Sequence, residues 1–214
     1  MYRLHGFFTQ NTMKTLYVLE ALGVEYEYCY VDLMQRENRS ESFMEKTPIG
    51  KVPVLEHDGE FLFESGAICR YVSSVEKSPL FPADKLERAR VDQWMTFFTC
   101  HPGRWLTEIY FEKIIKPKAG MGEMDQAACE KAERFIHQQL RPVERRFEFT
   151  DWLANDAMST ADVFALGYME QVHSTDFSLQ DYPRIQGWLS RLEALDSTAR
   201  ARARVRPYLE AMMS

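Results

Sequence analysis

The stretch that decides the fold runs from residue 47 to residue 65 and reads Thr47-Pro48-Ile49-Gly50-Lys51-Val52-Pro53-Val54-Leu55-Glu56-His57-Asp58-Gly59-Glu60-Phe61-Leu62-Phe63-Glu64-Ser65. Two short apolar runs are separated by Asp58-Gly59, a dipeptide that favours a tight hairpin. Pro53 has no backbone N–H and therefore belongs at the start or the edge of a strand. The stretch predicts two antiparallel neighbouring strands that the chain enters through a proline.

The two ends of this hairpin carry groups that suit a small peptide ligand. If the Val52–Pro53 bond is cis, the chain turns sharply and the backbone N–H and C=O of Val52 have no strand partner, so an extended peptide can pair with them. Ser65 precedes a helical apolar pattern and is a good N-cap, and free N–H groups at a helix start attract a carboxylate. Glu64 beside it can hold an ammonium group. We therefore predict a clamp for a zwitterionic α-amino acid end.

The overall composition argues against several classes of function. The chain has 214 residues, of which 45% are apolar and 27% charged, an ordinary balance for a globular protein. A net charge of -6 argues against a general role on nucleic acids or anionic membranes. No apolar run is long enough to cross a bilayer, so no membrane association is expected.

Cysteine and histidine positions indicate a reducing compartment and no metal. Cys29, Cys69, Cys100 and Cys129 are far apart and form no C-x-x-C pair, which argues against a disulfide framework and against zinc. The histidines lack metal-ligand spacing. Because the chain opens directly on a strand-like segment without a signal peptide, we expect a cytoplasmic protein.

Two domains are expected from the order of the predicted elements. The first 76 residues alternate strand and helix, in the order βαβ and then ββα. Strands are predicted at 2–8 and 25–31, a helix at 13–22, and the polar segment at 34–46 fits a short helix or a loop. Two prolines in residues 77–84 predict a linker.

Beyond the linker, residues 85–214 contain only helical patterns. The helices are predicted at 85–115 with a kink at Pro102-Gly103, at 125–149, from the capping pair Ser159 and Asp162 onward, at 183–195 and at 198–213. Four arginines near the end of the chain, at positions 200, 202, 204 and 206, are interpreted as a solvated helix face rather than an anion site.

These patterns resemble the soluble glutathione transferases over nearly the whole chain. The motifs that carry the resemblance are Pro48-x-Gly50-Lys51-Val52-Pro53-Val54-Leu55, Glu64-Ser65-x-Ala67-Ile68, Trp152-Leu153, Ser159-Thr160-Ala161-Asp162 and Tyr182-Pro183-x-Ile185-x-x-Trp188. The resemblance implies an α/β thioredoxin-like domain at 1–78 and an all-α domain at 85–214 with a second-substrate pocket. It also implies glutathione as a co-substrate and a homodimer.

The resemblance also implies roles for the residues of the hairpin. Val52 and Pro53 belong to the glutathione-binding residues, and Val52 pairs with the cysteinyl backbone of the ligand. Glu64 and Ser65 hold its γ-glutamyl end. Lys51 lies near the glycine carboxylate, and Asn38 or Arg39 falls near the same end of the ligand.

The start of the first helix is where this fold carries redox cysteines, and here it reads Thr9-Gln10-Asn11-Thr12. Because no cysteine is present, the thiol must come from the ligand. Thr9 and Asn11 are the candidate catalytic residues, and either can stabilise a bound thiolate; the alternative interpretation is that both are only helix caps. The Thr-x-Asn pair looks more like bacterial members of the family that favour glutathione-dependent disulfide reduction.

Candidate residues for the second-substrate pocket are Phe8, His101, Arg104, Trp105 and Tyr110, although core packing is an equal interpretation for Trp105. The leading hypothesis is a glutathione S-transferase with a detoxification role, in which activated glutathione attacks a small electrophile. The alternatives are a glutathione-dependent disulfide reductase, with peroxidase activity as a further possibility, and a non-catalytic adaptor of the same fold.

Overall fold

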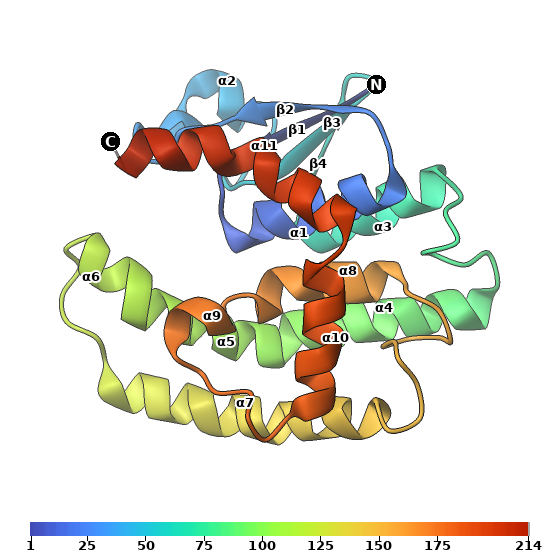
Figure 1. Ribbon diagram of the computed structural model, residues 1–214. Coiled ribbons are helices and arrows are strands. Elements are labelled where there is room, and N and C mark those ends of the chain that lie inside the picture. Colours follow the sequence, from blue (N-terminus) through green and yellow to red (C-terminus); the bar gives the residue numbers. More distant parts are fainter. Residues whose placement is uncertain (214) are drawn as a thin grey trace. The chain divides into compact units, whose positions relative to one another are not determined.

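Short strands and helices alternate through the first part of the chain, and only helices follow them (Figure 1). The computed structural model describes residues 1–213. The chain divides into two compact units. One contains Met1–Phe81 together with the chain from Ala194 onward, and the other is Pro82–Glu193. The sequence-based division, at 78 and 85, differs in that it assigns the last helix to the helical domain.

The first unit contains a βαβαββα arrangement, as predicted, with the last helix of the chain added to it. Its elements are β1 (Tyr2–Gly6), α1 (Gln10–Leu22), β2 (Tyr26–Tyr30), η1 (Glu37–Arg39), α2 (Glu41–Met44), β3 (Val54–His57), β4 (Glu60–Phe63), α3 (Ser65–Val75) and α11 (Asp196–Met213). The polar segment predicted as a short helix or a loop contains both the 3₁₀ turn η1 and the short helix α2.

The four strands form one sheet in the order β2-β1-β3-β4. β1 and β2 are parallel, whereas β3 is antiparallel to both β1 and β4. The hairpin predicted from Asp58-Gly59 is confirmed, since His57 pairs with Glu60 across the turn. Both turn residues have positive φ angles, as a two-residue hairpin loop requires.

Opposite faces of the sheet are covered by different helices. On one face, Phe43 of α2 packs with Val31 and Val54 in a small apolar cluster. On the other face, α1 packs against both α3 and α11. Apolar side chains of α1, α3 and the strands are almost fully buried between these layers, among them Leu4, Leu16, Leu55, Ile68 and Val72.

Helix α11 is fastened to α1 by an ionic cluster around Glu20, whose side chain is 7% exposed. Arg200 Nε lies 2.9 Å from Glu20 Oε2, and Arg204 Nε lies 3.0 Å from Oε1. Tyr26 donates its hydroxyl to the same carboxylate at 2.8 Å. Arg200 and Arg204 are exposed, as expected for a solvated face, but their guanidinium groups also form ion pairs with Glu20, which that interpretation did not include. Sequence alone did not indicate the buried acid, 180 residues away, that binds them.

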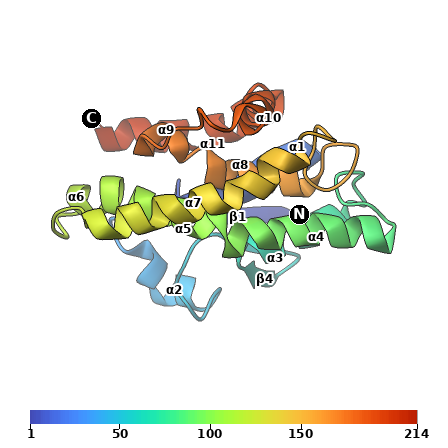
Figure 2. The ribbon, with the colours of Figure 1, turned by 90° about the horizontal axis from the view of Figure 1, so that it is seen from below.

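The second unit contains α4 (Lys85–Cys100), α5 (Pro102–Tyr110), η2 (Phe111–Ile115), α6 (Lys116–Lys118), α7 (Gln126–Arg146), α8 (Thr160–Met169), α9 (Val172–Thr175) and α10 (Pro183–Glu193). The predicted kink at Pro102 is a full break at His101 between α4 and α5. The prediction missed α9 and the π-helical turn η2. Helices α5 and α7 run alongside each other (Figure 2).

At the centre of the helical unit, Asp162 connects α8 to its surroundings. Its carboxylate accepts hydrogen bonds from the backbone N–H groups of Leu153 and Ser159, each at 2.9 Å. It also accepts from Ser159 Oγ at 2.8 Å and from Trp188 Nε1 at 3.0 Å. The predicted capping pair of Ser159 and Asp162 is confirmed. Every residue of α8 is buried, which agrees with the sequence Val163-Phe164-Ala165-Leu166 that is apolar on all sides of the helix.

Candidate functional site

The loop between β1 and α1 places two candidate residues at the start of α1. Thr9 is the N-cap, and its side chain accepts a hydrogen bond from the Thr12 N–H at 3.4 Å. The hydroxyls of Thr9 and Thr12 lie 3.3 Å apart. Gly6 permits this packing, because a Cβ there would lie only 2.4 Å from Thr12 Cγ2. The Thr9 hydroxyl therefore has a capping role, as the alternative interpretation stated.

Asn11, in the first turn of α1, lines a cavity of about 150 Å³ in the first unit. The other residues that line it are Ile49, Lys51, Val52, Pro53, Phe63, Glu64 and Ser65. All five residues predicted to bind glutathione thus share one cavity with one of the two candidate catalytic residues. Thr9 is not among the lining residues. Ile49 and Phe63 were not predicted, although both belong to the quoted stretch.

Lys51 and Val52 are held in a loop that leads into β3. The Val52–Pro53 bond is cis, and Val52 lies two residues before Val54, the first residue of the strand. Asn38 Nδ2 donates to the Gly50 carbonyl at 2.7 Å and braces the loop from η1. Gly50 has a φ of 56°, and a Cβ there would lie 2.9 Å from the carbonyl oxygen of Asn38. The sequence assigned Asn38 to this end of the site only loosely.

At the other end of the cavity, Glu64 has an unusual backbone conformation, with φ 69° and ψ 110°. The residue that precedes α3 is Glu64, and Ser65 is already the first residue of the helix, so the prediction of Ser65 as N-cap was wrong by one position. The Glu64 side chain makes no capping hydrogen bond. The first N–H groups of an 11-residue helix and an exposed carboxylate therefore lie side by side.

The side chain of Lys14 in α1 is buried near the start of α3. Burial lowers the pKa of Lys14 to about 7, although nearby Cys69 and Glu64 act in the opposite direction. The backbone of α1 is joined to α3 here, since Cys69 Sγ lies 3.8 Å from the Lys14 carbonyl oxygen. Burial raises the pKa of Cys69 to about 12, so this thiol is protonated at neutral pH.

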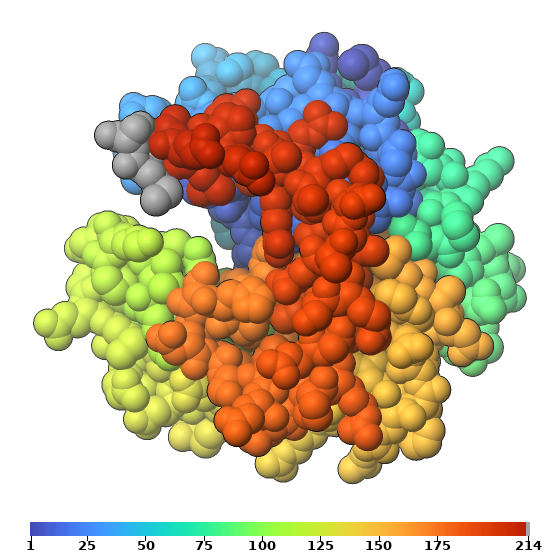
Figure 3. Space-filling view, viewed as in Figure 1, coloured from blue at the N-terminus to red at the C-terminus, as the bar shows by residue number. Residues whose placement is uncertain are grey.

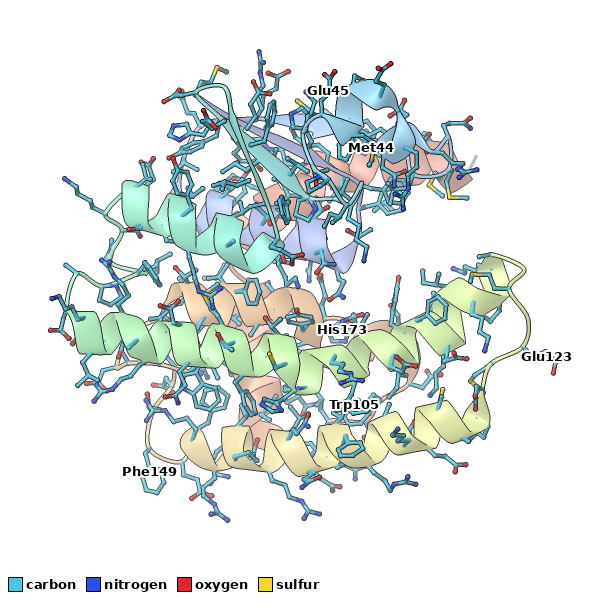
Figure 4. All side chains as sticks on the ribbon, turned by 180° about the vertical axis from the view of Figure 1, so that it is seen from behind. Met44, Glu45, Trp105, Glu123, Phe149 and His173 are labelled. Carbon is cyan, nitrogen blue, oxygen red and sulfur yellow. The ribbon has the colours of Figure 1, made fainter. Side chains whose placement is uncertain are left out.

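The candidates for a second-substrate pocket are distributed over both units. Phe8 lies beside Thr9 in the first unit and stacks on Phe7, with ring centroids 3.9 Å apart. Trp105 lies between α5 and α7 in the helical unit (Figure 4), where it stacks on Phe135 at 4.5 Å. The guanidinium of Arg104 lies 4.9 Å from the Trp105 ring. Trp105 therefore takes part in the packing of the two helices.

The remaining two candidates also belong to the helical unit. His101 is exposed at the break between α4 and α5, and its ring centroid lies 5.3 Å from that of Phe97. Tyr110 is half-buried at the end of α5, and burial raises the pKa of its hydroxyl. Among residues 1–213, no group of three or more histidine, cysteine, aspartate or glutamate side chains could hold a metal ion. None of the described helices is long and apolar enough to cross a membrane.

The chain has a thioredoxin-like domain, in which a cis-proline loop lies beside the start of α3, followed by an all-helical domain. This combination defines a class of two-domain proteins. Family models agree with it: the glutathione S-transferase N-terminal domain matches residues 1–74, and the C-terminal domain matches residues 101–196. The chain belongs to the glutathione S-transferase family.

Individual relatives cover almost the full chain. A probable glutathione S-transferase of Oryza sativa subsp. japonica is 28% identical over 200 residues, which cover 92% of this chain and 93% of the relative. The structure of maize glutathione S-transferase I in complex with an atrazine glutathione conjugate has a TM-score of 0.89 and 28% identity, and the match covers 96% and 98% of the two chains. A possible glutathione S-transferase from Rhodopseudomonas palustris has a TM-score of 0.81 and 28% identity, with 92% and 88% covered.

Proposed function

We propose that this protein is a glutathione transferase, which binds glutathione in the cavity of the first unit and directs its thiolate at an electrophilic small molecule. The observation that carries the proposal is the gathering of Lys51, Val52, Glu64 and Ser65 around one cavity that also contains Asn11. The solved relative from maize, which holds a glutathione conjugate of atrazine, supports conjugation as the reaction.

Each group in the cavity has a partner on an extended tripeptide. The backbone of Val52 pairs with the cysteinyl unit, as an added strand would. Glu64 accepts the α-ammonium group of the γ-glutamyl end, whose carboxylate takes the free N–H groups at the start of α3 near Ser65. Lys51 offers its charge to the glycine carboxylate.

Asn11 is the donor that we assign to the sulfur. A free thiol has a pKa near ~8.5, and lowering it by about 2 units requires roughly 2.7 kcal/mol of selective thiolate stabilisation. One hydrogen bond to a charged group contributes about 1.5–3 kcal/mol, and the start of a helix adds about 0.3–1 kcal/mol. A single amide donor at the start of α1 is therefore enough, and the Thr9 hydroxyl contributes through the helix cap.

The thiolate then attacks the electrophile directly. With an aryl halide, a carbon–sulfur bond forms and halide leaves with its electron pair. With a disulfide, a mixed disulfide forms and a thiolate leaves; a second glutathione thiolate then attacks the mixed disulfide, which releases the other thiolate and glutathione disulfide. The second route, disulfide reduction, is the alternative function, and the Thr-x-Asn pair favours it. We further propose, from the family alone, an intracellular homodimer with a detoxification role.

A paired rate assay tests the proposal. One reaction offers glutathione with an aryl halide, and the other offers glutathione with a small disulfide. A higher rate with the halide supports conjugation, and a higher rate with the disulfide supports the reductase. Binding of glutathione without activity in either reaction would instead indicate the adaptor.

The role of Asn11 predicts a shift in the bound thiol. In Asn11→Ala, ultraviolet titration of the enzyme-bound glutathione thiolate should show a pKa raised by about 1 unit, because the variant lacks roughly 1.5 kcal/mol of hydrogen-bond stabilisation. Thr9→Ala, by comparison, should lower the stability of α1 and move the thiol pKa less. A titration curve that is unchanged in Asn11→Ala contradicts the assignment.

A further inference from the structure

A second cavity lies within the helical unit and shares no residue with the first. Its volume is about 420 Å³, which is within the range of small-molecule sites. The lining residues that matter are Lys113, Ile114, Met124, Cys129, Glu133 and Asp176. They come from η2, from the approach to α7, from α7 itself and from the end of α9. In the space-filling view, the yellow-green segment that includes η2 adjoins the orange segment of α9 (Figure 3).

One wall of this cavity is built by the π-helical turn η2. Such turns are rare and occur frequently at functional sites. Glu112 within the turn is buried, and it accepts hydrogen bonds from Lys116 Nζ and from the Asp125 N–H, both at 2.7 Å. The bond from the Asp125 N–H holds Asp125, the N-cap of α7, in place. It thereby also positions Met124, the residue before it. These bonds connect η2 to the start of α7, so two parts of the cavity wall are joined within the protein. Figure 4 labels Glu123, just before Met124, and His173 of α9.

Part of the lining is apolar. Ile114 and Met124 contribute aliphatic surface, and Cys129 is 1% exposed in the wall formed by α7. Met124 is 39% exposed, so part of its side chain is accessible from the cavity. A ligand with an apolar body would bury this surface.

The charges of the cavity favour a cation. Lys113 is already engaged, because its Nζ donates to the Thr175 carbonyl at 2.8 Å and lies 3.6 Å from Glu133 Oε1. Asp176 follows α9 in the left-handed conformation, with φ 57°, and is exposed. Within residues 1–213, its carboxylate forms no hydrogen bond or ion pair. The lining therefore contains two carboxylates, those of Glu133 and Asp176, and one ammonium group, that of Lys113, which is already paired. Its net charge is negative.

We propose that this cavity is a second ligand site, which accepts a small molecule with a primary ammonium group on an apolar body. The ammonium group pairs with Asp176 and with the outer side of Glu133, and the apolar body lies against Ile114 and Met124. The site is independent of glutathione and of the reaction proposed for the first unit.

Phenethylamine is a suitable probe, and the full-length protein labelled with ¹³C at its methionine methyl groups provides the readout. The Met124 signal is assigned with Met124→Leu. Titration should move the Met124 signal saturably with a dissociation constant of about 1 mM, as expected for a ligand of this size. Asp176→Asn should weaken binding about fivefold or more, as should replacement of the probe by neutral 2-phenylethanol.

Asp156→Asn is the matched control, since Asp156 is also an exposed carboxylate of the helical unit; it should leave the affinity unchanged. Saturating glutathione should leave it unchanged as well. The proposal is overturned if the Met124 signal does not respond, if the two aspartate variants behave alike, or if 2-phenylethanol binds as tightly as the amine. Competition by glutathione would also overturn the proposal of a second site, because it would indicate that the amine binds in the first cavity. That outcome would not bear on the proposed transferase reaction.

Discussion

At the scale of single residues, the backbone of Glu64 is the unusual feature of the candidate site. A positive φ costs a non-glycine residue about 1–3 kcal/mol, and such strain persists where surrounding structure imposes it. Here the conformation joins β4 to α3 and leaves the first N–H groups of the helix without a side-chain cap. The same conformation places a carboxylate on the lining of the cavity.

Glu64 should therefore dominate the recognition of the γ-glutamyl end. We expect Glu64→Ala to weaken glutathione binding about 10- to 100-fold, because a charge-assisted hydrogen bond contributes about 1.5–3 kcal/mol. Isothermal titration calorimetry measures this directly. Glu60→Ala, an exposed acid on the same hairpin, is the control. Equal affinities for wild type and Glu64→Ala would rule out the site.

Most of the residues that line the first cavity could be predicted from the sequence because they are close together along the chain. Pro53, Glu64 and Ser65 belong to a single hairpin and its exit, so local rules were sufficient to place them together. Local rules did not distinguish Thr9 from Asn11. Their difference depends on Thr12, whose hydroxyl lies beside that of Thr9, while Asn11 points to the cavity.

At the scale of elements, the helical unit depends on the buried cap of α8. Burial raises the pKa of Asp162, and four hydrogen bonds from Leu153, Ser159 and Trp188 oppose that shift. Asp162→Asn should lower the free energy of unfolding by about 3 kcal/mol, since an amide cannot accept all four bonds and its NH₂ group meets N–H donors.

Urea denaturation checks this expectation. Asp151→Asn, which changes an exposed acid just before the same loop, should leave the denaturation midpoint unchanged. If the two variants unfold at the same urea concentration, the network does not have the stabilising role that its geometry indicates.

The docking of α11 on α1 should depend on pH through Glu20. Burial alone would raise the pKa of Glu20, but hydrogen bonds from Tyr26, Arg200 and Arg204 outweigh it and hold the pKa below its usual range. Because the folded-state pKa is depressed, this stabilisation is present above the unfolded pKa of about 4.3 and is lost as pH falls through the folded value.

We therefore expect Glu20→Gln to cost about 1–3 kcal/mol at pH 7 and progressively less as the pH falls below the unfolded pKa of about 4.3. Unfolding free energies measured for both proteins across this interval provide the test. Glu25→Gln, an exposed acid that follows α1, should show no such pH dependence. A cost that stays constant down to the lowest pH would contradict the assignment.

Helix periodicity predicted most of these elements, and what it missed is informative. The segments 85–115 and 125–149 were recognised from long amphipathic patterns, and Pro102 correctly marked the break. The turn η2 was missed, because a single π-helical turn changes the register of a helix without any characteristic residue. The partner of Arg200 was missed because tertiary contacts across 180 positions leave no local pattern.

At the scale of the whole molecule, exposed apolar side chains of the first unit favour the proposed homodimer. Phe63, Tyr71 and Val75 expose 38%, 37% and 43% of their surfaces on β4 and α3. Tyr71 and Val75 lie four residues apart and therefore on one face of α3, and exposed apolar surface of this kind is a common feature of interfaces between proteins. The association itself is implied by the family.

Light scattering after size-exclusion chromatography should give a mass of about 50 kDa, twice the 25.1 kDa of one chain. The double variant Tyr71→Glu/Val75→Glu should return the mass of a single chain. Leu86→Glu, which changes a leucine that is 63% exposed in the helical unit, should not. A monomeric wild type would exclude the dimer.

The position of α11 has a consequence for how the protein is made. The N-terminal unit is completed only by the last stretch of the polypeptide, whereas Pro82–Glu193 is synthesised as one uninterrupted block. On the ribosome, the helical unit can fold while Glu20 still lacks Arg200 and Arg204. Loss of the residues from 194 onward would therefore affect the part of the protein that is synthesised first.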